Sequence, residues 1–156
     1  MPVLSTFGAM SARGFGMLGG GFTFELADSQ QELDLETYLT GQGWNGATPV
    51  VLTIPNPLYV WSDDTSTAAL TISSAFNDKL TIINYGYING RGGNGGFVNK
   101  SAGQAGGPAI SNAATGVGFQ NNSGAFIAGG GGGGAGGTCG GGGGAGGGVG
   151  GGSTAT

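Results

Sequence analysis

Histidine is absent from this 156-residue chain, and cysteine occurs only once, as Cys139. These two residues are the commonest zinc ligands in proteins, and histidine is the commonest general base. The sequence therefore excludes a zinc site, a histidine-dependent catalytic triad and an intrachain disulfide. For Cys139 two interpretations stay open, a small apolar side chain that fills space and a site of oxidation between chains.

Charged residues are scarce, with four Lys and Arg against eight Asp and Glu. The basic residues form no stripe with interleaved aromatic side chains of the kind that follows a phosphate backbone. They are Arg13, Lys79, Arg91 and Lys100. We therefore expect no nucleic acid partner.

Long apolar runs are also missing, since no stretch approaches the roughly 18 consecutive apolar residues of a membrane-spanning helix. At the N-terminus, Arg13 follows Val3 and Leu4, whereas a signal peptide has its basic residues before its apolar segment. We expect a protein that is made and assembled in a cytoplasm and does not insert into a membrane.

Glycine dominates what is present, at 40 residues in the whole chain. Glycine adds no side chain to a core and loses the most backbone freedom on folding, so a single chain of this composition needs stabilising partners. We predict self-association.

The densest glycine run is from Gly129 to Gly152, where 19 of 24 residues are glycine. Small residues interrupt it, and serine, which is common in flexible linkers, is absent until its end. The interruptions follow no strict third-residue frame and include no proline, which excludes collagen. For residues 91–156 we predict a distal region of extended glycine helices with three residues per turn, packed side by side through amide hydrogen bonds.

Residues 1–21 carry spaced large apolar side chains without a helical or strand period. We predict an extended assembly arm that docks into a neighbouring subunit and becomes ordered there, with a disordered tail as the alternative. The residues expected to make these contacts are Leu4, Phe7, Met10, Phe15, Met17 and Leu18.

Residues 22–90 are predicted to form a short helix followed by a region of strands. Alternation over 22–26 indicates a first strand. Ser29 and Glu32 fit a capping box, which predicts a helix from about Gln30 to Thr40 that ends before Gly41. The acidic residues of this helix, Glu32, Asp34 and Glu36, are interpreted as a solvated face.

Four further short strands are predicted at 50–54, 58–61, 69–72 and 80–83, separated by turn residues. Their spacing of about ten residues is typical of a small β-sandwich or of a β-solenoid, and the fold class is mainly β. We favour the solenoid because the segment from Asn84 to Gly93 returns in looser form from Asn122 to Gly130. Each copy runs from a strand into glycine, so the two glycine runs should lie side by side.

Aromatic side chains next to the glycine runs are the candidate contacts for another molecule, with packing in the core as the alternative. These residues are Tyr85, Tyr87, Phe97, Phe119 and Phe126. The segment Gly90–Gly95 lacks the Gly-Lys-Ser ending of a phosphate loop. No cofactor, metal site or catalytic residue is predicted.

The order of Gly43-Trp44-Asn45-Gly46, strands, Asn84-Tyr85-Gly86-Tyr87-Ile88 and polyglycine resembles glycine-rich domains of tailed-bacteriophage tail-tip and tail-fibre proteins. The resemblance covers about residues 31–152. It implies a domain at the distal end of a host-recognition protein, commonly trimeric, that takes part in adsorption to a bacterial surface protein or polysaccharide.

Three hypotheses follow. The first is a structural tail-fibre or tail-tip protein that presents its glycine-rich end to a host receptor. The second is a capsid decoration or head-fibre protein that stabilises the particle. The third is a small glycoside-processing or peptidoglycan-active enzyme that uses Asp63, Asp64 and Glu36, which is disfavoured because adjacent carboxylates rarely provide an opposed acid and base.

Overall fold

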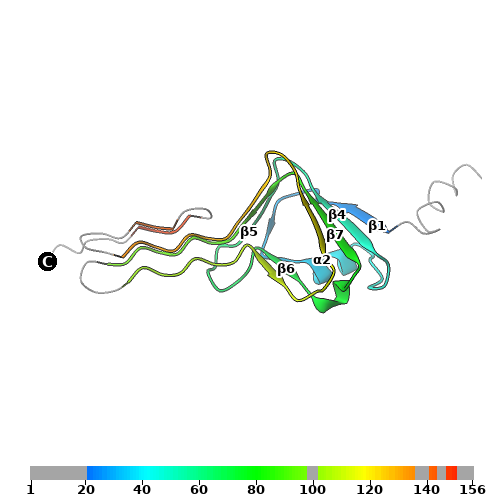
Figure 1. Ribbon diagram of the computed structural model, residues 1–156, viewed down its shortest axis with the longest axis horizontal. Helices are drawn as coiled ribbons and strands as arrows, with labels where there is room; N and C mark the ends of the chain where they lie inside the picture. Colours follow the sequence, from blue (N-terminus) through cyan, green and yellow to red (C-terminus); the bar gives the residue numbers. More distant parts are fainter. Residues whose placement is uncertain (1–20, 98–101, 136–140, 144–146, 151–156) are drawn as a thin grey trace, which may run out of the picture.

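The computed structural model describes residues 21–97, 102–135, 141–143 and 147–150. The residues assigned to the assembly arm, from Leu4 to Leu18, and also Cys139 lie outside these ranges. The described chain has two parts, a triangular body of strands and a slender glycine-rich extension that projects from one corner of the body (Figure 1).

The body is built from short strands that form three parallel sheets. The strands are β1 (Phe22–Glu25), β2 (Gln30–Gln31), β3 (Leu33–Asp34), β4 (Val50–Ile54), β5 (Tyr59–Trp61), β6 (Leu70–Ile72), β7 (Leu80–Asn84), β8 (Tyr87–Asn89), β9 (Ile110–Asn112), β10 (Gly118–Asn121) and β11 (Phe126–Ala128).

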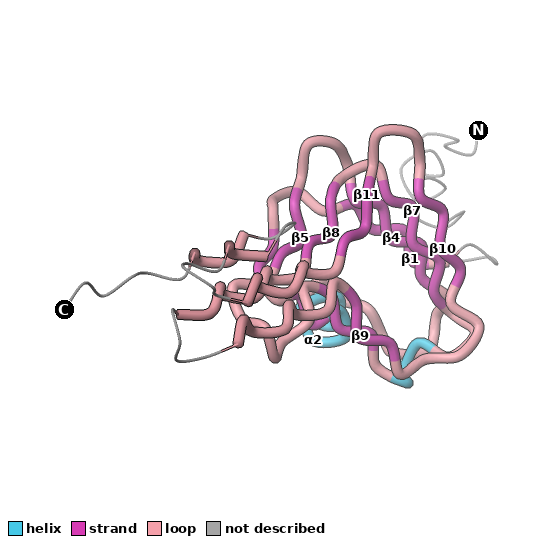
Figure 2. The backbone as a smooth tube through the Cα atoms, turned by 60° about the vertical axis from the view of Figure 1, so that its left-hand side comes forward, coloured by secondary structure: helices cyan, strands magenta, loops and turns pink. Residues whose placement is uncertain are grey.

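The chain visits the three sheets in turn, so that each circuit adds one strand to each sheet. The sheet orders are β1-β4-β7-β10, β11-β8-β5-β2 and β3-β6-β9. The first rung therefore holds β1 to β3, the second β4 to β6, the third β7 to β9 and the fourth β10 and β11. Figure 2 shows β5, β8 and β11 side by side. Of the two predicted architectures, this is the solenoid, because all pairs are parallel and link successive circuits.

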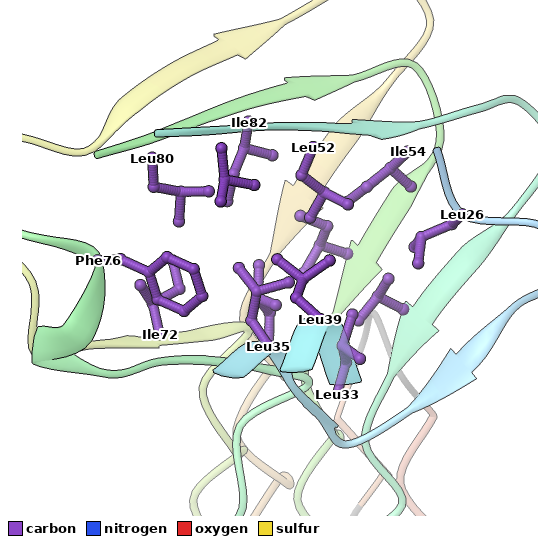
Figure 3. Packing of buried hydrophobic residues seen from close by; sticks show 14 of the residues in the cluster. Leu26, Leu33, Leu35, Leu39, Leu52, Ile54, Ile72, Phe76, Leu80 and Ile82 are labelled. Carbon is purple, nitrogen blue, oxygen red and sulfur yellow. The ribbon is translucent and has the colours of Figure 1, made fainter. Parts of the chain in front are cut away.

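Alternation along each strand sends every second side chain into the solenoid. In β4 the buried residues are Val50, Leu52 and Ile54, and the residues between them are half-buried. Parallel register places Leu52 beside Ile82 in the next rung, and Ile82 beside Phe119 in the last. The core is therefore a set of apolar columns that run along the solenoid axis (Figure 3).

The single α-helix of the described residues, α2 (Leu35–Gly41), lies against β3 of the first rung and β6 of the second. Its N-cap is Asp34, whose side chain accepts a hydrogen bond of 2.8 Å from the Thr37 amide. Leu35 and Leu39 are fully buried and point into the core cluster (Figure 3). Tyr38 makes an edge contact with Phe24 of β1. Helix α2 therefore covers the first-rung end of the core.

The predicted helix start at Gln30 is wrong, since residues 30–31 and 33–34 pair as strands with β5 and β6. Glu32 sits between them with a φ of 48° and turns the chain at the corner of the solenoid. The Ser29 hydroxyl accepts a hydrogen bond of 3.0 Å from the Tyr59 amide instead of capping a helix. Pairing with later rungs thus outweighs the local capping signal.

Replacement of Ile82, which is fully buried in β7, tests the columns of the core. Ile82→Ala should lower the free energy of unfolding by about 2–5 kcal/mol, because it removes buried methyl groups and leaves a cavity. Thr81→Ala is the matched control, since Thr81 is the exposed neighbour on the same strand. Urea denaturation measures both values, and equal effects would contradict the assignment of the core.

Candidate functional site

The glycine-rich extension consists of segments that leave the solenoid at its β8 and β11 corner. Residues 90–97 run outward directly after β8, and residues 102–109 return to β9. Residues 129–135 run outward after β11, and 141–143 and 147–150 lie in the same bundle (Figure 1). Two glycine runs far apart in sequence therefore lie side by side, as the sequence repeat predicted.

Backbone hydrogen bonds between the two outgoing segments recur at every third residue. Each joins a donor and an acceptor that are 38 residues apart, with lengths between 2.8 and 2.9 Å. They run from the amides of Gly90, Gly93 and Gly96 to the carbonyls of Ala128, Gly131 and Gly134. The spacing shows that amides three residues apart point in the same direction.

The returning segment is hydrogen-bonded to both outgoing segments, again at positions three residues apart. Its amides at Gln104 and Gly107 donate to Asn94 and Arg91, at 2.8 and 2.7 Å. Its carbonyls at Gly107 and Gln104 accept from Gly130 and Gly133, at 2.8 and 2.7 Å. The three segments thus form a laterally bonded bundle without side chains between them.

Close backbone approach explains why glycine is required at particular positions. A Cβ added at Gly93 would overlap the carbonyl oxygen of Gln104, and one at Gly130 would overlap that of Arg91. At Gly132 the nearest atom to such a Cβ is the Gln104 oxygen at 3.7 Å, which is an ordinary contact. The bundle therefore excludes side chains on its inner faces and tolerates them on its outer faces.

Asn94 ties the last described segment to the bundle. Its side-chain oxygen accepts a hydrogen bond of 3.0 Å from the Val149 amide, and the Val149 carbonyl accepts one of 2.8 Å from the Gly95 amide. Gly143 is buried and donates to the Gly93 carbonyl at 2.8 Å. One asparagine in a glycine run therefore fixes the position of residues more than fifty positions later.

The loop after β5 supports the base of the extension. A Cβ added at Gly107 would lie 2.9 Å from the Cα of Thr65, so this loop packs closely against the returning glycine segment. Asp64 accepts hydrogen bonds from the Ser66 amide and hydroxyl, at 2.9 and 2.8 Å. The pKa of the Asp64 carboxyl is held below its ordinary value, mainly by the hydrogen bond from the Ser66 amide and next by the one from the Ser66 hydroxyl. This carboxylate stabilises a turn, and its low pKa is opposite to what a general acid needs.

The candidate aromatic residues do not form one surface. Tyr87 and Phe126 lie together on the outer face of the sheet formed by β2, β5, β8 and β11, with ring centroids 4.7 Å apart. Tyr85 is exposed in the turn between β7 and β8, and Phe119 is exposed on β10. Phe97 is exposed at the outer end of the first glycine segment.

A third ring, which sequence reasoning missed, completes the stack on that sheet. Tyr59 of β5 lies 4.7 Å from Tyr87, so Tyr59, Tyr87 and Phe126 form an aromatic ladder along the solenoid. Each is the first residue of its strand, and the strands read Tyr-Val-Trp, Tyr-Ile-Asn and Phe-Ile-Ala. Alignment of these three segments would have found Tyr59.

Within the part of the chain that the structure describes, no group of three or more His, Cys, Asp or Glu residues could hold a metal ion. Over the same residues, no helix has the length and apolar character needed to cross a bilayer.

The model of one protein family, phage tail fibre adhesin Gp38, matches residues 21–156. The chain belongs to this family. A search of curated proteins and a search of solved structures found no match. The resemblance to phage tail-fibre proteins is therefore confirmed. As a tail fibre adhesin, the protein is a virion component that is attached to the phage tail and binds a host receptor, and its family is structural rather than enzymatic.

Replacement of Gly93 tests the bundle of this adhesin. In Gly93→Ala the new methyl group displaces the Gln104 carbonyl, which accepts from Gly133. The Gly133 amide should exchange its hydrogen about tenfold faster, as expected for one weakened hydrogen bond. Gly132→Ala, whose Cβ would make only an ordinary contact of 3.7 Å with the Gln104 oxygen, should leave that rate unchanged. Amide exchange followed by NMR measures both, and equal rates in the two variants would count against the described packing.

Proposed function

We propose that this tail fibre adhesin presents the outer end of its glycine-rich extension to the host receptor, with the solenoid as its base. The observation that carries the proposal is the lateral hydrogen bonding of the extension, which holds its segments together as they project from the body. A bundle tied at every third residue keeps its outer end at a fixed distance and direction from the solenoid.

The segments of the extension are proposed to be polyglycine-type helices. A left-handed extended helix has three residues per turn, so that every third amide points to the same side. The donors at Gly90, Gly93 and Gly96 have this spacing. Such helices are normally solvated, and glycine allows them to bond to one another instead because no Cβ separates their backbones.

The distal region at 91–156 has only two charged side chains, Arg91 and Lys100, so most of it can contact a receptor only through uncharged groups. No residue after Lys100 carries a charged side chain. Phe97 is the one candidate aromatic that lies on the extension, and it is half-exposed there. We propose Phe97 as a contact for an apolar or sugar surface of the receptor, which can be a protein or a polysaccharide. Tyr85, Tyr87, Phe119 and Phe126 lie on the solenoid and remain candidates for a receptor that extends past the bundle.

Attachment to the virion is proposed to use the arm at residues 1–21, through Leu4, Phe7, Met10, Phe15, Met17 and Leu18. The division into this arm, the strand region at 22–90 and the distal region at 91–156 is part of the same proposal. Residues 91–156 also supply β9, β10 and β11 to the solenoid. Synthesis in the host cytoplasm, the lack of catalysis and the homotrimer stay predictions from the sequence.

A capsid decoration or head-fibre role is the second candidate function. The same chemistry of neutral, rigid glycine segments would suit it, whereas the family match favours the tail. Copy number in purified virions separates the two, because decoration requires many copies per particle.

Deletion of residues 129–156 tests receptor binding. The deletion starts directly after β11 and keeps every strand of the solenoid. It leaves Ala128, which accepts from Gly90, but removes the carbonyls that accept from the Gly93 and Gly96 amides. We expect particles that assemble and carry the truncated protein but no longer adsorb to host cells. Adsorption is measured as the loss of free phage from a mixture with bacteria, and the truncated protein is detected in virions by immunoblot.

Two controls make this outcome specific. Deletion of residues 1–21 should instead prevent incorporation, so its virions should lack the protein. Gly132→Ala should adsorb normally, since its Cβ would make only an ordinary contact with the Gln104 oxygen. Normal adsorption by virions that carry the truncated protein would overturn the assignment of the receptor-binding end.

A further inference from the structure

The Gly-Trp-Asn-Gly motif at residues 43–46 forms the loop that leads from α2 toward β4. Asn45 and Gly46 are both exposed in this loop. Gly46 has a φ of 75°, and a Cβ added there would meet open space. Over the described ranges, no group accepts a hydrogen bond from the Gly46 amide. The peptide nitrogen that follows Asn45 is therefore unprotected and open to water.

The side-chain amide of Asn45 is polarised by three hydrogen-bond donors. Its oxygen accepts from the Ala47 amide at 3.0 Å, from the Thr48 amide at 2.9 Å and from the Thr48 hydroxyl at 3.0 Å. Donors placed in this way stabilise the negative charge that develops on a carbonyl oxygen when a nucleophile attacks its carbon. The loop thus combines an unprotected backbone nitrogen with an activated side-chain carbonyl next to it.

We propose that Asn45 is a site of spontaneous deamidation, with water as the only co-reactant. The Gly46 nitrogen loses its proton to water and forms a bond to Cγ of Asn45. The bond from Cγ to Nδ2 breaks, and Nδ2 takes up a proton from water and leaves as ammonia, which produces a five-membered succinimide ring. A second water opens this ring at either carbonyl to give aspartate or isoaspartate. The net change is one water consumed and one ammonia released.

The two other Asn-Gly pairs of the chain lie where the fold blocks the same reaction. They are Asn89-Gly90, where the extension begins, and Asn94-Gly95 within its first glycine segment. Both glycines are buried, and each amide donates a hydrogen bond of 2.8 Å to a carbonyl of another segment. Attack by either nitrogen requires this bond to break and the bundle to open locally. We therefore expect both pairs to react about tenfold or more slowly than Asn45.

Deamidation of Asn45 would also weaken the support of a buried tryptophan. The Thr48 carbonyl belongs to the turn that Asn45 holds, and it accepts a hydrogen bond of 2.8 Å from Nε1 of Trp44. Trp44 is buried, and its ring stacks on that of Phe76 with centroids 4.5 Å apart. Isoaspartate lengthens the main chain by one carbon and shortens the side chain by one, so the turn loses its geometry. The modified loop should therefore hold Trp44 less firmly.

Peptide mapping of the aged full chain tests the proposal. Folded protein and protein unfolded in guanidinium chloride are kept in mildly alkaline buffer, and mass spectrometry follows the mass gain that accompanies conversion of an amide into an acid. Each Asn-Gly pair falls on a different peptide, because trypsin cleaves after Arg13, Lys79, Arg91 and Lys100. In the folded chain Asn45 should react about tenfold or more faster than Asn89 and Asn94. In the unfolded chain the three rates should be similar, because only the shared Asn-Gly sequence then acts.

Asn45→Gln is the matched control, since its longer side chain would have to close a less favourable six-membered ring. The peptide at 14–79 also contains Asn56 and Asn77, so loss of its mass gain in this variant assigns the reaction to Asn45. The comparison of the three pairs uses the unaltered chain and does not depend on how the variant folds. Equal rates in the folded chain, faster reaction at Asn89 or Asn94, or an Asn45 that stays an amide while the unfolded chain reacts would each overturn the proposal.

Discussion

Parallel register between successive rungs is the constraint on which the rest of the structure depends. The pairs between β8 and β11 place Tyr87 beside Phe126 and Asn89 beside Ala128. The next donors along the chain, Gly90, Gly93 and Gly96, keep a constant offset of 38 residues from their acceptors. The alignment of the solenoid therefore continues into the glycine segments, which lie side by side because the strands before them do.

This continuity explains how a chain with so much glycine is ordered. The large apolar residues are concentrated in the rungs, where Leu52, Ile82 and Ile88 are fully buried within one chain. The glycine segments add no apolar core and are stabilised by backbone hydrogen bonds between neighbours that the solenoid has already brought together. The entropy that glycine loses on ordering is offset in part because each segment begins from a fixed position.

The features that matter for function divide between the two parts of the adhesin. The solenoid has one end covered by α2 and one end, formed by β10 and β11, where the repeat stops. The extension carries neutral backbone outward from one corner, with Asn94 fixing its last described segment. Under the proposed function, the outer end of the extension contacts the receptor and the solenoid is its base.

The sequence by itself determined the mainly β class, the strands that the structure has at 22–25, 50–54, 59–61, 70–72 and 80–84, the repeat at Asn84 and Asn122, and the absence of histidine. Alternation and turn residues are local signals, so they can be read without knowledge of contacts. Tertiary structure alone decided that the rungs close into a three-sided solenoid and that the helix begins at Leu35, not Gln30. It also decided that the Tyr59 ring stacks with those of Tyr87 and Phe126. Tertiary contacts likewise leave no room for a side chain at Gly93, whereas they leave room for one at Gly132. These outcomes depend on contacts between residues from about ten to about forty positions apart, such as Gly93 with Gln104 and Tyr87 with Phe126, and no local pattern encodes which neighbour a backbone will meet.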